Sequence, residues 1–212
     1  MGGIQDELNS FINKYKVVKG RPYTNTSIGY PKMSLFIPDT EYNEFIRIYS
    51  LAITNGIHLH FTEKPLNPSP LRIDLDFRFL ITQSHETIDT NSQQKYNRLY
   101  TVDNINRIIE YYNNIITKYI NINDDYNLAY IMEKSNPTLF RNKLKDGIHI
   151  VYPFIILTHN EQHFIRRKVL DIADEMFKGL QTSNSNEDII DKAIIDVNSW
   201  QMYSSRKPDC EA

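Results

Sequence analysis

Apolar residues recur three or four positions apart in several segments of the chain, the spacing of one face of an amphipathic helix. The first such segment covers residues 4–17. Three further helices are expected to begin at Asp39, Asp103 and Thr158, residue types that cap helix N-termini, and Thr158 has Glu161 at capping-box spacing. The pattern therefore predicts amphipathic helices distributed along the whole chain.

Other segments alternate between apolar and polar residues or are short apolar runs, as expected for strands. These are residues 34–37, 57–61, 71–79, 128–132, 148–157 and 200–203. Residues 80–100 show no periodicity, and residues 135–147 are basic and contain a proline, so both segments are predicted to be loops. Strands and helices interleave, which predicts an α/β (α+β) fold in two layers.

Composition narrows the class of protein. The 212 residues are 41% hydrophobic, and the longest apolar runs are far shorter than the ~18 residues of a membrane span, so no membrane partner is expected. The first residues lack the features of a secretion signal. The single cysteine, Cys210, excludes an internal disulfide and a cysteine-based zinc cluster, so no zinc is expected within this segment. The last residues, KPDCEA, suggest a piece of a longer protein.

Two aspartates lie on one face of the predicted strand LRIDLDFRF. Asp74 and Asp76 are two residues apart, so their Cα atoms are separated by about 6.6 Å and both side chains point the same way. Carboxylates at this spacing can share divalent cations, as two-metal phosphoryl-transfer sites require. Alternatively, this is the solvated face of an amphipathic strand on which Arg72 and Arg78 pair with the aspartates.

A histidine follows a glycine in the segment KDGIHIVYP. His149 is predicted to project from the face opposite Ile148 and Ile150, and Lys145 lies four residues before it within a basic stretch. Cations beside a histidine could hold a triphosphate. The alternative is a basic turn followed by a partly buried histidine.

A third acidic residue ends an apolar run near the C-terminus. Asp196 follows two isoleucines, and Arg206 and Lys207 follow a Tyr-Ser-Ser turn. Asp196 could be a third carboxylate if the end of its predicted strand opened onto the same cleft. It could equally be an ordinary strand-end or N-cap aspartate.

These motifs, in this order, resemble the primase-polymerase domain of the archaeo-eukaryotic primase superfamily, and most closely the version at the N-terminus of primase-helicases of nucleocytoplasmic large DNA viruses. RIDLDF matches the first motif at Asp74 and Asp76, GIHIVYP the second at His149, and IIDV the third at Asp196. YSSRKP matches a downstream Tyr-x-Ser-x-Lys-like turn. Many members have serine where this chain has Gly147, and some carry a zinc motif, which would have to lie beyond Ala212.

The resemblance implies a primase or primase-polymerase with an RRM-like catalytic sheet packed by helices in a lobe of about residues 66–212, and a small N-terminal α/β lobe of about residues 1–65. It implies that Asp74, Asp76 and Asp196 bind two Mg²⁺ or Mn²⁺ ions. The implied nucleotide-binding residues are His149, Lys145, Arg206 and Lys207.

The implied partners are a single-stranded DNA template, nucleoside triphosphates and a helicase module in the same full-length chain. The implied location is the host cytoplasm or nucleus. Two other functions stay open: a two-metal nuclease, or a catalytically silent DNA-binding or helicase-loading module. No G-x-x-x-x-G-K-[ST] motif occurs, so P-loop ATP hydrolysis is not expected in this segment.

Overall fold

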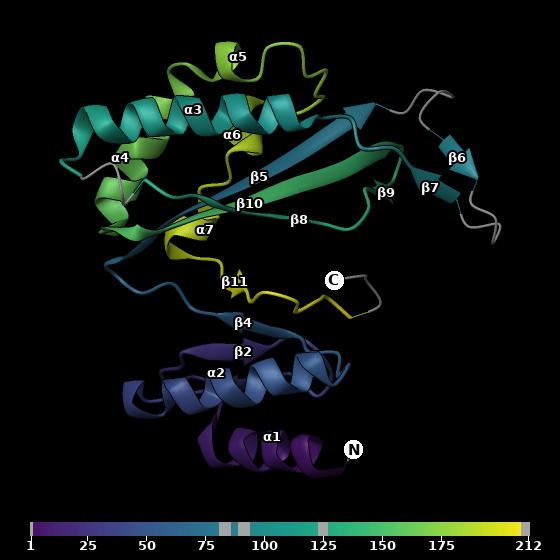
Figure 1. Cartoon of the computed structure of the whole chain (residues 1–212), viewed down its shortest axis with the longest axis vertical. Helices are drawn as coiled ribbons and strands as arrows, with labels where there is room; N and C mark the ends of the chain where they lie inside the picture. The colour runs from purple at the N-terminus through teal and green to yellow at the C-terminus, as the bar shows by residue number, and fades with distance from the viewer. Residues whose placement is uncertain (1, 81–85, 89–93, 123–126, 209–212) are drawn as a thin grey trace. The chain divides into compact units, whose positions relative to one another are not determined.

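The structure, a computed structural model, describes residues 2–80, 86–88, 94–122 and 127–208 (Figure 1). The chain forms two compact units. The first comprises residues 1–65 and 198–212, and the second residues 66–197. The sequence reasoning assigned residues 198–212 to the catalytic lobe, whereas β11 within them pairs with β4 of the first unit.

The first unit is an antiparallel sheet with two helices. Its elements are α1 Gly2–Tyr15, β1 Lys16–Val17, β2 Asn25–Ser27, β3 Met33–Leu35, α2 Asp39–Thr54, β4 Phe61–Glu63 and β11 Trp200–Gln201. The strands follow the order β1-β3-β2-β4-β11. The apolar faces of both helices enter one core with residues of the sheet and of its loops: Leu8, Phe11, Leu35, Ile37, Phe45, Ile48, Tyr49, Ala52, Leu59, Phe61 and Met202.

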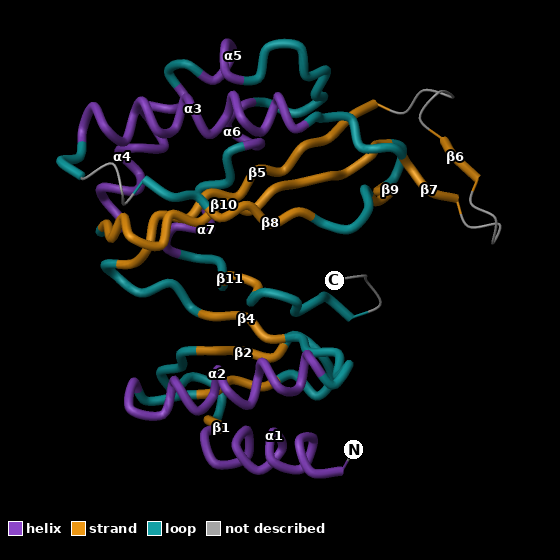
Figure 2. The backbone as a smooth tube through the Cα atoms, viewed as in Figure 1, coloured by secondary structure: helices purple, strands orange, loops and turns teal. Residues whose placement is uncertain are grey.

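The second unit carries the longer strands. Its elements are β5 Ser69–Leu80, β6 Glu86–Ile88, β7 Gln94–Tyr96, α3 Val102–Tyr119, β8 Tyr130–Glu133, β9 Thr138–Phe140, β10 Lys143–Leu157, α4 His159–Leu170, α5 Ala173–Met176, α6 Asn186–Ile189 and α7 Ala193–Asp196. β10 lies between β5 and β8 and also pairs with β9, always antiparallel, and β6 pairs with β7 (Figure 2).

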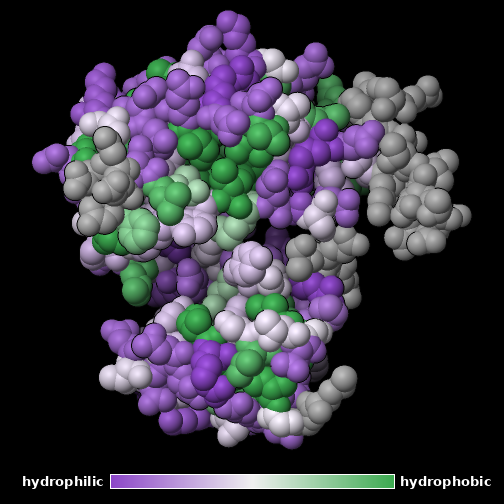
Figure 3. Space-filling model, in the orientation of Figure 1, coloured by the Kyte–Doolittle hydropathy of each residue, from purple (hydrophilic) through white to green (hydrophobic). Residues whose placement is uncertain are grey.

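Helices cover one face of the β5–β10 pair in the second unit. Alternate residues of β5 are buried, and Leu75 and Phe77 are fully inaccessible. They share a core with Ile108 and Ile116 of α3 and with Ile165 of α4. The outer surface over α3 and α5 is mostly hydrophilic (Figure 3). The polar residues that alternate with the buried ones therefore project from the opposite face of β5 and β10.

The predicted fold class is confirmed: antiparallel sheets are packed by helices. The Thr158 capping box is present, with Glu161 bonded back to Thr158. The predicted caps Asp39 and Asp103 are one and two residues inside their helices, which start after Pro38 and Thr101. Within the described residues, none of the helices combines the length and apolar character that a membrane crossing requires.

Several local predictions are wrong. Residues 57–60 of the predicted strand 57–61 are not in a strand, and β4 begins at Phe61. The predicted loop 80–100 contains the paired strands β6 and β7, and the predicted loop 135–147 contains β9 and the start of β10. Polar and basic hairpins form without apolar alternation because backbone pairing holds them. The run ending at Asp196 is the short helix α7 and not a strand.

Candidate active site

Antiparallel pairing of β5 and β10 brings the first two predicted motifs together. Asp74 lies opposite His149, and Asp76 lies opposite Gly147. Residues opposite each other in a sheet share a face, so the histidine and both carboxylates project from the same polar surface. The Nε2 atom of His149 is 3.5 Å from Oδ1 of Asp74.

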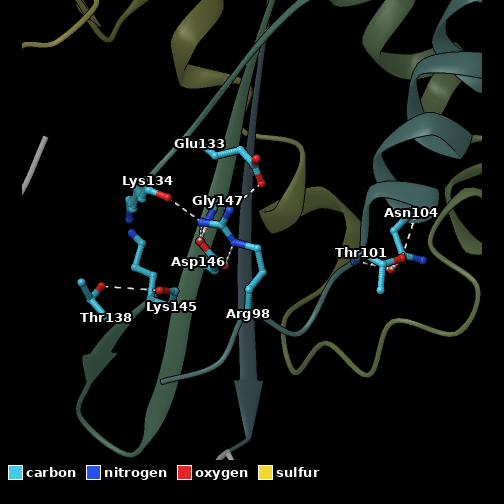
Figure 4. Close-up of polar contacts among 9 residues, drawn as sticks. All are labelled: Arg98, Thr101, Asn104, Glu133, Lys134, Thr138, Lys145, Asp146 and Gly147. Atoms are coloured by element: carbon cyan, nitrogen blue, oxygen red, sulfur yellow. Dashed lines mark hydrogen bonds and ion pairs between the residues drawn. The ribbon is translucent and has the colours of Figure 1, made fainter. Parts of the chain in front are cut away.

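Lys145 also belongs to this surface. Its Nζ atom is 3.1 Å from Oδ2 of Asp76, and Nη2 of Arg78 is 3.4 Å from the same oxygen. Figure 4 shows the Lys145 side chain extending from β10 toward Lys134, which follows β8. The pairing of Arg78 with Asp76, expected for a salt-bridged strand face, is therefore present together with a second cation.

Gly147 is required by the packing of the two strands. A Cβ atom added there would lie 2.7 Å from the carbonyl oxygen of Leu75, inside any normal contact distance. The structure shows that this glycine allows close approach of the β5 backbone.

A third aspartate, Asp191, lies beside Asp74 in the chain that follows α5. Residues 182–191 run along the edge of β5 that β10 leaves open, with isolated bridges between Phe79 and Thr182 and between Leu75 and Ile190. The backbone N–H of Asp191 donates to the carbonyl oxygen of Asp74 at 3.0 Å. Asp191 therefore lies beside Asp74 on the strand edge.

Asp196 has a different partner. Its Oδ2 atom is 3.1 Å from Nε2 of His163 on α4, and 43% of its side chain is exposed. The structure thus gives Asp191, and not Asp196, the position beside Asp74 predicted for the third carboxylate. The sequence contains two Ile-Ile-Asp tripeptides, at 189–191 and 194–196, and the first was the signal that could have found Asp191.

The charges on this surface act on Asp74. Burial, together with the negative charges of Asp191 and Asp76, raises the pKa of the Asp74 carboxyl to about 6. The positive charges of Lys145 and Lys134 act in the opposite direction. Lys134 was missed by the sequence reasoning because it lies in a polar segment without periodicity. Asp74 thus loses its proton at a higher pH than an ordinary aspartate, because burial and the nearby negative charge both disfavour its ionised form.

Arg206 and Lys207 belong to the first unit. The turn that carries them is held there: Arg206 N–H donates to the carbonyl oxygen of Leu59 at 2.9 Å, and the hydroxyls of Tyr49 and Ser205 are 3.0 Å apart. Their contribution to nucleotide binding stays a prediction.

The donor set fits a hard divalent cation. Carboxylate oxygens are the ligands that Mg²⁺ and Mn²⁺ prefer, and a cation would offset the charge that raises the Asp74 pKa. Over the described parts of the chain, no three His, Cys, Asp or Glu side chains already stand close enough to hold a metal ion. The fit therefore rests on ligand chemistry and charge.

Comparison with known proteins identifies the family of this chain. Residues 24–212 match the family model described as the C962R protein N-terminal AEP domain, where AEP denotes archaeo-eukaryotic primase. The chain belongs to this family. The AEP domain assignment confirms the resemblance drawn from the sequence motifs and supports a primase-type function in general. AEP domains generally use divalent metals.

Three viral proteins are similar to this AEP domain over most of its length. "Putative helicase L207/L206" of Acanthamoeba polyphaga mimivirus is 31% identical over 95% of the chain. "Putative helicase 184R" of Invertebrate iridescent virus 6 is 24% identical over 87%, and "Putative helicase 121R" of Invertebrate iridescent virus 3 is 22% identical over 96%. The AEP domain spans about a fifth of the length of each of these relatives.

Proposed function

We propose that this AEP domain is a template-directed nucleotidyltransferase that makes primers for viral DNA replication from nucleoside triphosphates. The observation that carries the proposal is the cluster of Asp74, Asp76 and Asp191 on β5 and its open edge, beside Lys145 and Lys134. Clustered carboxylates repel one another, and such a cluster is favourable when cations bind between them.

Each group has a distinct role in this proposal. Asp74, Asp76 and Asp191 hold two divalent cations, Mg²⁺ or Mn²⁺, which activate the attacking hydroxyl and offset charge on the leaving phosphate. Lys145 neutralises the triphosphate, since its Nζ atom already lies 3.1 Å from a carboxylate oxygen of the cluster. His149, 3.5 Å from Asp74, donates a hydrogen bond to the triphosphate.

The remaining parts of the proposal concern the whole protein. Arg206 and Lys207 bind nucleotide, and single-stranded DNA is the template. A helicase module lies in the same full-length chain, because the similar viral proteins are named as helicases and are about five times longer than this domain. The protein acts in the host cytoplasm or nucleus.

A primer-synthesis assay on single-stranded DNA tests the proposal. Ribo- and deoxynucleoside triphosphates are supplied in parallel, each with Mg²⁺ or with Mn²⁺. Wild type should make primers, and Asp74→Asn should reduce the rate by about 10³-fold or more, since it removes a charged ligand. Degradation of the template without added triphosphate would indicate a nuclease instead.

The two Ile-Ile-Asp tripeptides supply a matched pair of variants for the same assay. Asp191→Asn should abolish synthesis. Asp196→Asn should leave the rate within about threefold of wild type, because Asp196 forms only a partly exposed pair with His163. The reverse result would identify Asp196, and not Asp191, as the third metal-binding carboxylate. A wild-type protein that makes no product under any of these conditions would favour the silent module.

A further inference from the structure

The β9–β10 hairpin presents an exposed aromatic side chain among cations. Phe140, at the end of β9, is 56% exposed. The guanidinium carbon of the next residue, Arg141, lies 5.3 Å from the centre of the Phe140 ring. Cation–π contact of this kind leaves the other ring face available for stacking.

Strand register places Phe140 on the carboxylate face of the sheet. Phe140 lies opposite Lys143, and Thr138 lies opposite Lys145, whose ammonium pairs with Asp76. Residues two apart on a strand share a face, so Phe140 and Lys143 share the face of Lys145. Figure 4 shows Thr138 beside Lys145 in this hairpin.

The distance along the strand suits a polymer that also reaches the carboxylates. Lys143 precedes Gly147, the partner of Asp76, by four residues, which corresponds to about 13 Å of strand. At ~3.4 Å per nucleotide along a stacked strand, about four nucleotides of a single strand cover this distance. A base on Phe140 and a nucleotide at Asp76 can thus belong to one strand.

The hairpin is positively charged within a chain whose net charge is −2. Residues 134–145 contain four cations, Lys134, Arg141, Lys143 and Lys145, and no acidic residue. Basic groups around an exposed aromatic ring complement a polyanion that carries flat bases, which is the recognition chemistry of single-stranded nucleic acids.

We propose that the β9–β10 hairpin binds single-stranded nucleic acid, with Phe140 stacking on a base and Arg141 and Lys143 pairing with the neighbouring phosphates. The direction in which the strand continues, toward Asp76, rests on the function proposed above. Binding at the hairpin itself requires neither divalent cations nor catalysis.

Fluorescence anisotropy with a labelled oligothymidylate of about 20 nucleotides tests the proposal, in EDTA and without triphosphate. Phe140→Ala should raise Kd about fivefold or more, the fold-change that corresponds to ~1 kcal/mol, whereas Phe140→Trp should retain binding within about twofold. Phe154→Ala is the matched control, since Phe154 lies on β10 and is 53% exposed. It should leave Kd unchanged.

Salt dependence tests the phosphate contacts separately. Arg141→Ala and Lys143→Ala should each reduce the slope of log K against log salt by about 0.7, the value for one phosphate contact on a single strand. Phe140→Ala should lower affinity without changing that slope. Equal affinities of wild type and Phe140→Ala would overturn the proposal, as would equal losses in Phe140→Ala and Phe154→Ala.

Failure of this proposal is distinguishable from failure of the proposed function. Thermal stabilisation by Mn²⁺ with a triphosphate reports the carboxylate site alone and should be the same in wild type and Phe140→Ala. If the oligonucleotide does not bind while that stabilisation persists, only the hairpin proposal is wrong. If the oligonucleotide binds through Phe140 but the stabilisation is absent, only the catalytic proposal is wrong.

Discussion

The pH dependence of stability should reveal the combined effect of burial and of neighbouring negative charge on Asp74. The pKa of this carboxyl is about 6 in the folded chain, compared with an ordinary value of 3.8. A carboxyl whose pKa is raised by folding favours the folded state when it is protonated. Its contribution to stability is therefore fully present below about pH 4 and is lost as the pH rises through about 6.

Asp74→Asn isolates this contribution, because asparagine resembles the protonated acid in shape and stays neutral. A pKa difference of about 2 corresponds to about 3 kcal/mol at 1.36 kcal/mol per pKa unit. A quarter of the Asp74 side chain is exposed, so solvent screening makes this an upper value. In EDTA, the free energy of unfolding of the variant should rise by ~2–3 kcal/mol relative to that of wild type between about pH 4 and pH 7. Above pH 7 the difference should stay constant.

The assay is urea unfolding followed by circular dichroism for both proteins at each pH. Asp196→Asn is the control. Loss of its exposed pair with His163 should change the free energy of unfolding relative to wild type by less than ~1 kcal/mol over the same pH range. Added Mn²⁺ should reduce the advantage of Asp74→Asn, since a cation that binds the folded wild-type carboxylates stabilises that protein selectively. A difference that stays constant from pH 4 to pH 8 would refute this account of the site.

Three further predictions concern neighbouring residues. Arg98→Met should lower the free energy of unfolding by ~3 kcal/mol in urea titrations. The substitution leaves the fully inaccessible carboxylate of Asp146, 2.9 Å from the arginine, without its ion pair. An effect below ~1 kcal/mol would contradict this. Gly147→Ala should lower the melting temperature and cost ~1–3 kcal/mol, because the new methyl group would collide with the β5 backbone; an unchanged melting curve would show that β5 can shift. Lys145→Met should raise the pKa of Asp74 and move the acidic limb of the pH profile of kcat/KM upward, and an unmoved limb would exclude that electrostatic coupling.

The sequence predicted those parts of the fold that depend on local periodicity. β5 alternates cleanly because one face enters the core and the other carries Asp74 and Asp76, so both the strand and the carboxylate pair could be predicted. The hairpins β6–β7 and β9–β10 could not, since their pairing is encoded by backbone geometry in polar segments. Periodicity within a single strand says nothing about the neighbour it will meet.

Local sequence patterns also could not decide whether Asp191 or Asp196 is the third carboxylate of the cluster. Both residues follow two isoleucines. What separates them is the contact between Asp191 and the backbone of Asp74, more than a hundred residues earlier, and the turn of α7 that directs Asp196 toward His163. Only the tertiary pairing of residues 182–191 along β5 decides which aspartate joins the cluster.

That pairing also explains how the chain keeps repelling carboxylates together. β5 is bonded on one edge to β10 and on the other to residues 182–191, where the Asn184 amide donates to the carbonyl oxygen of Asp76 at 2.7 Å. Beneath it, Leu75 and Phe77 are fully buried in the core. Because the backbone is fixed on both edges and on one face, β5 and its neighbours cannot move apart to relieve the repulsion between the carboxylates. The unfavourable charge is retained in the folded state and is available to favour cation binding.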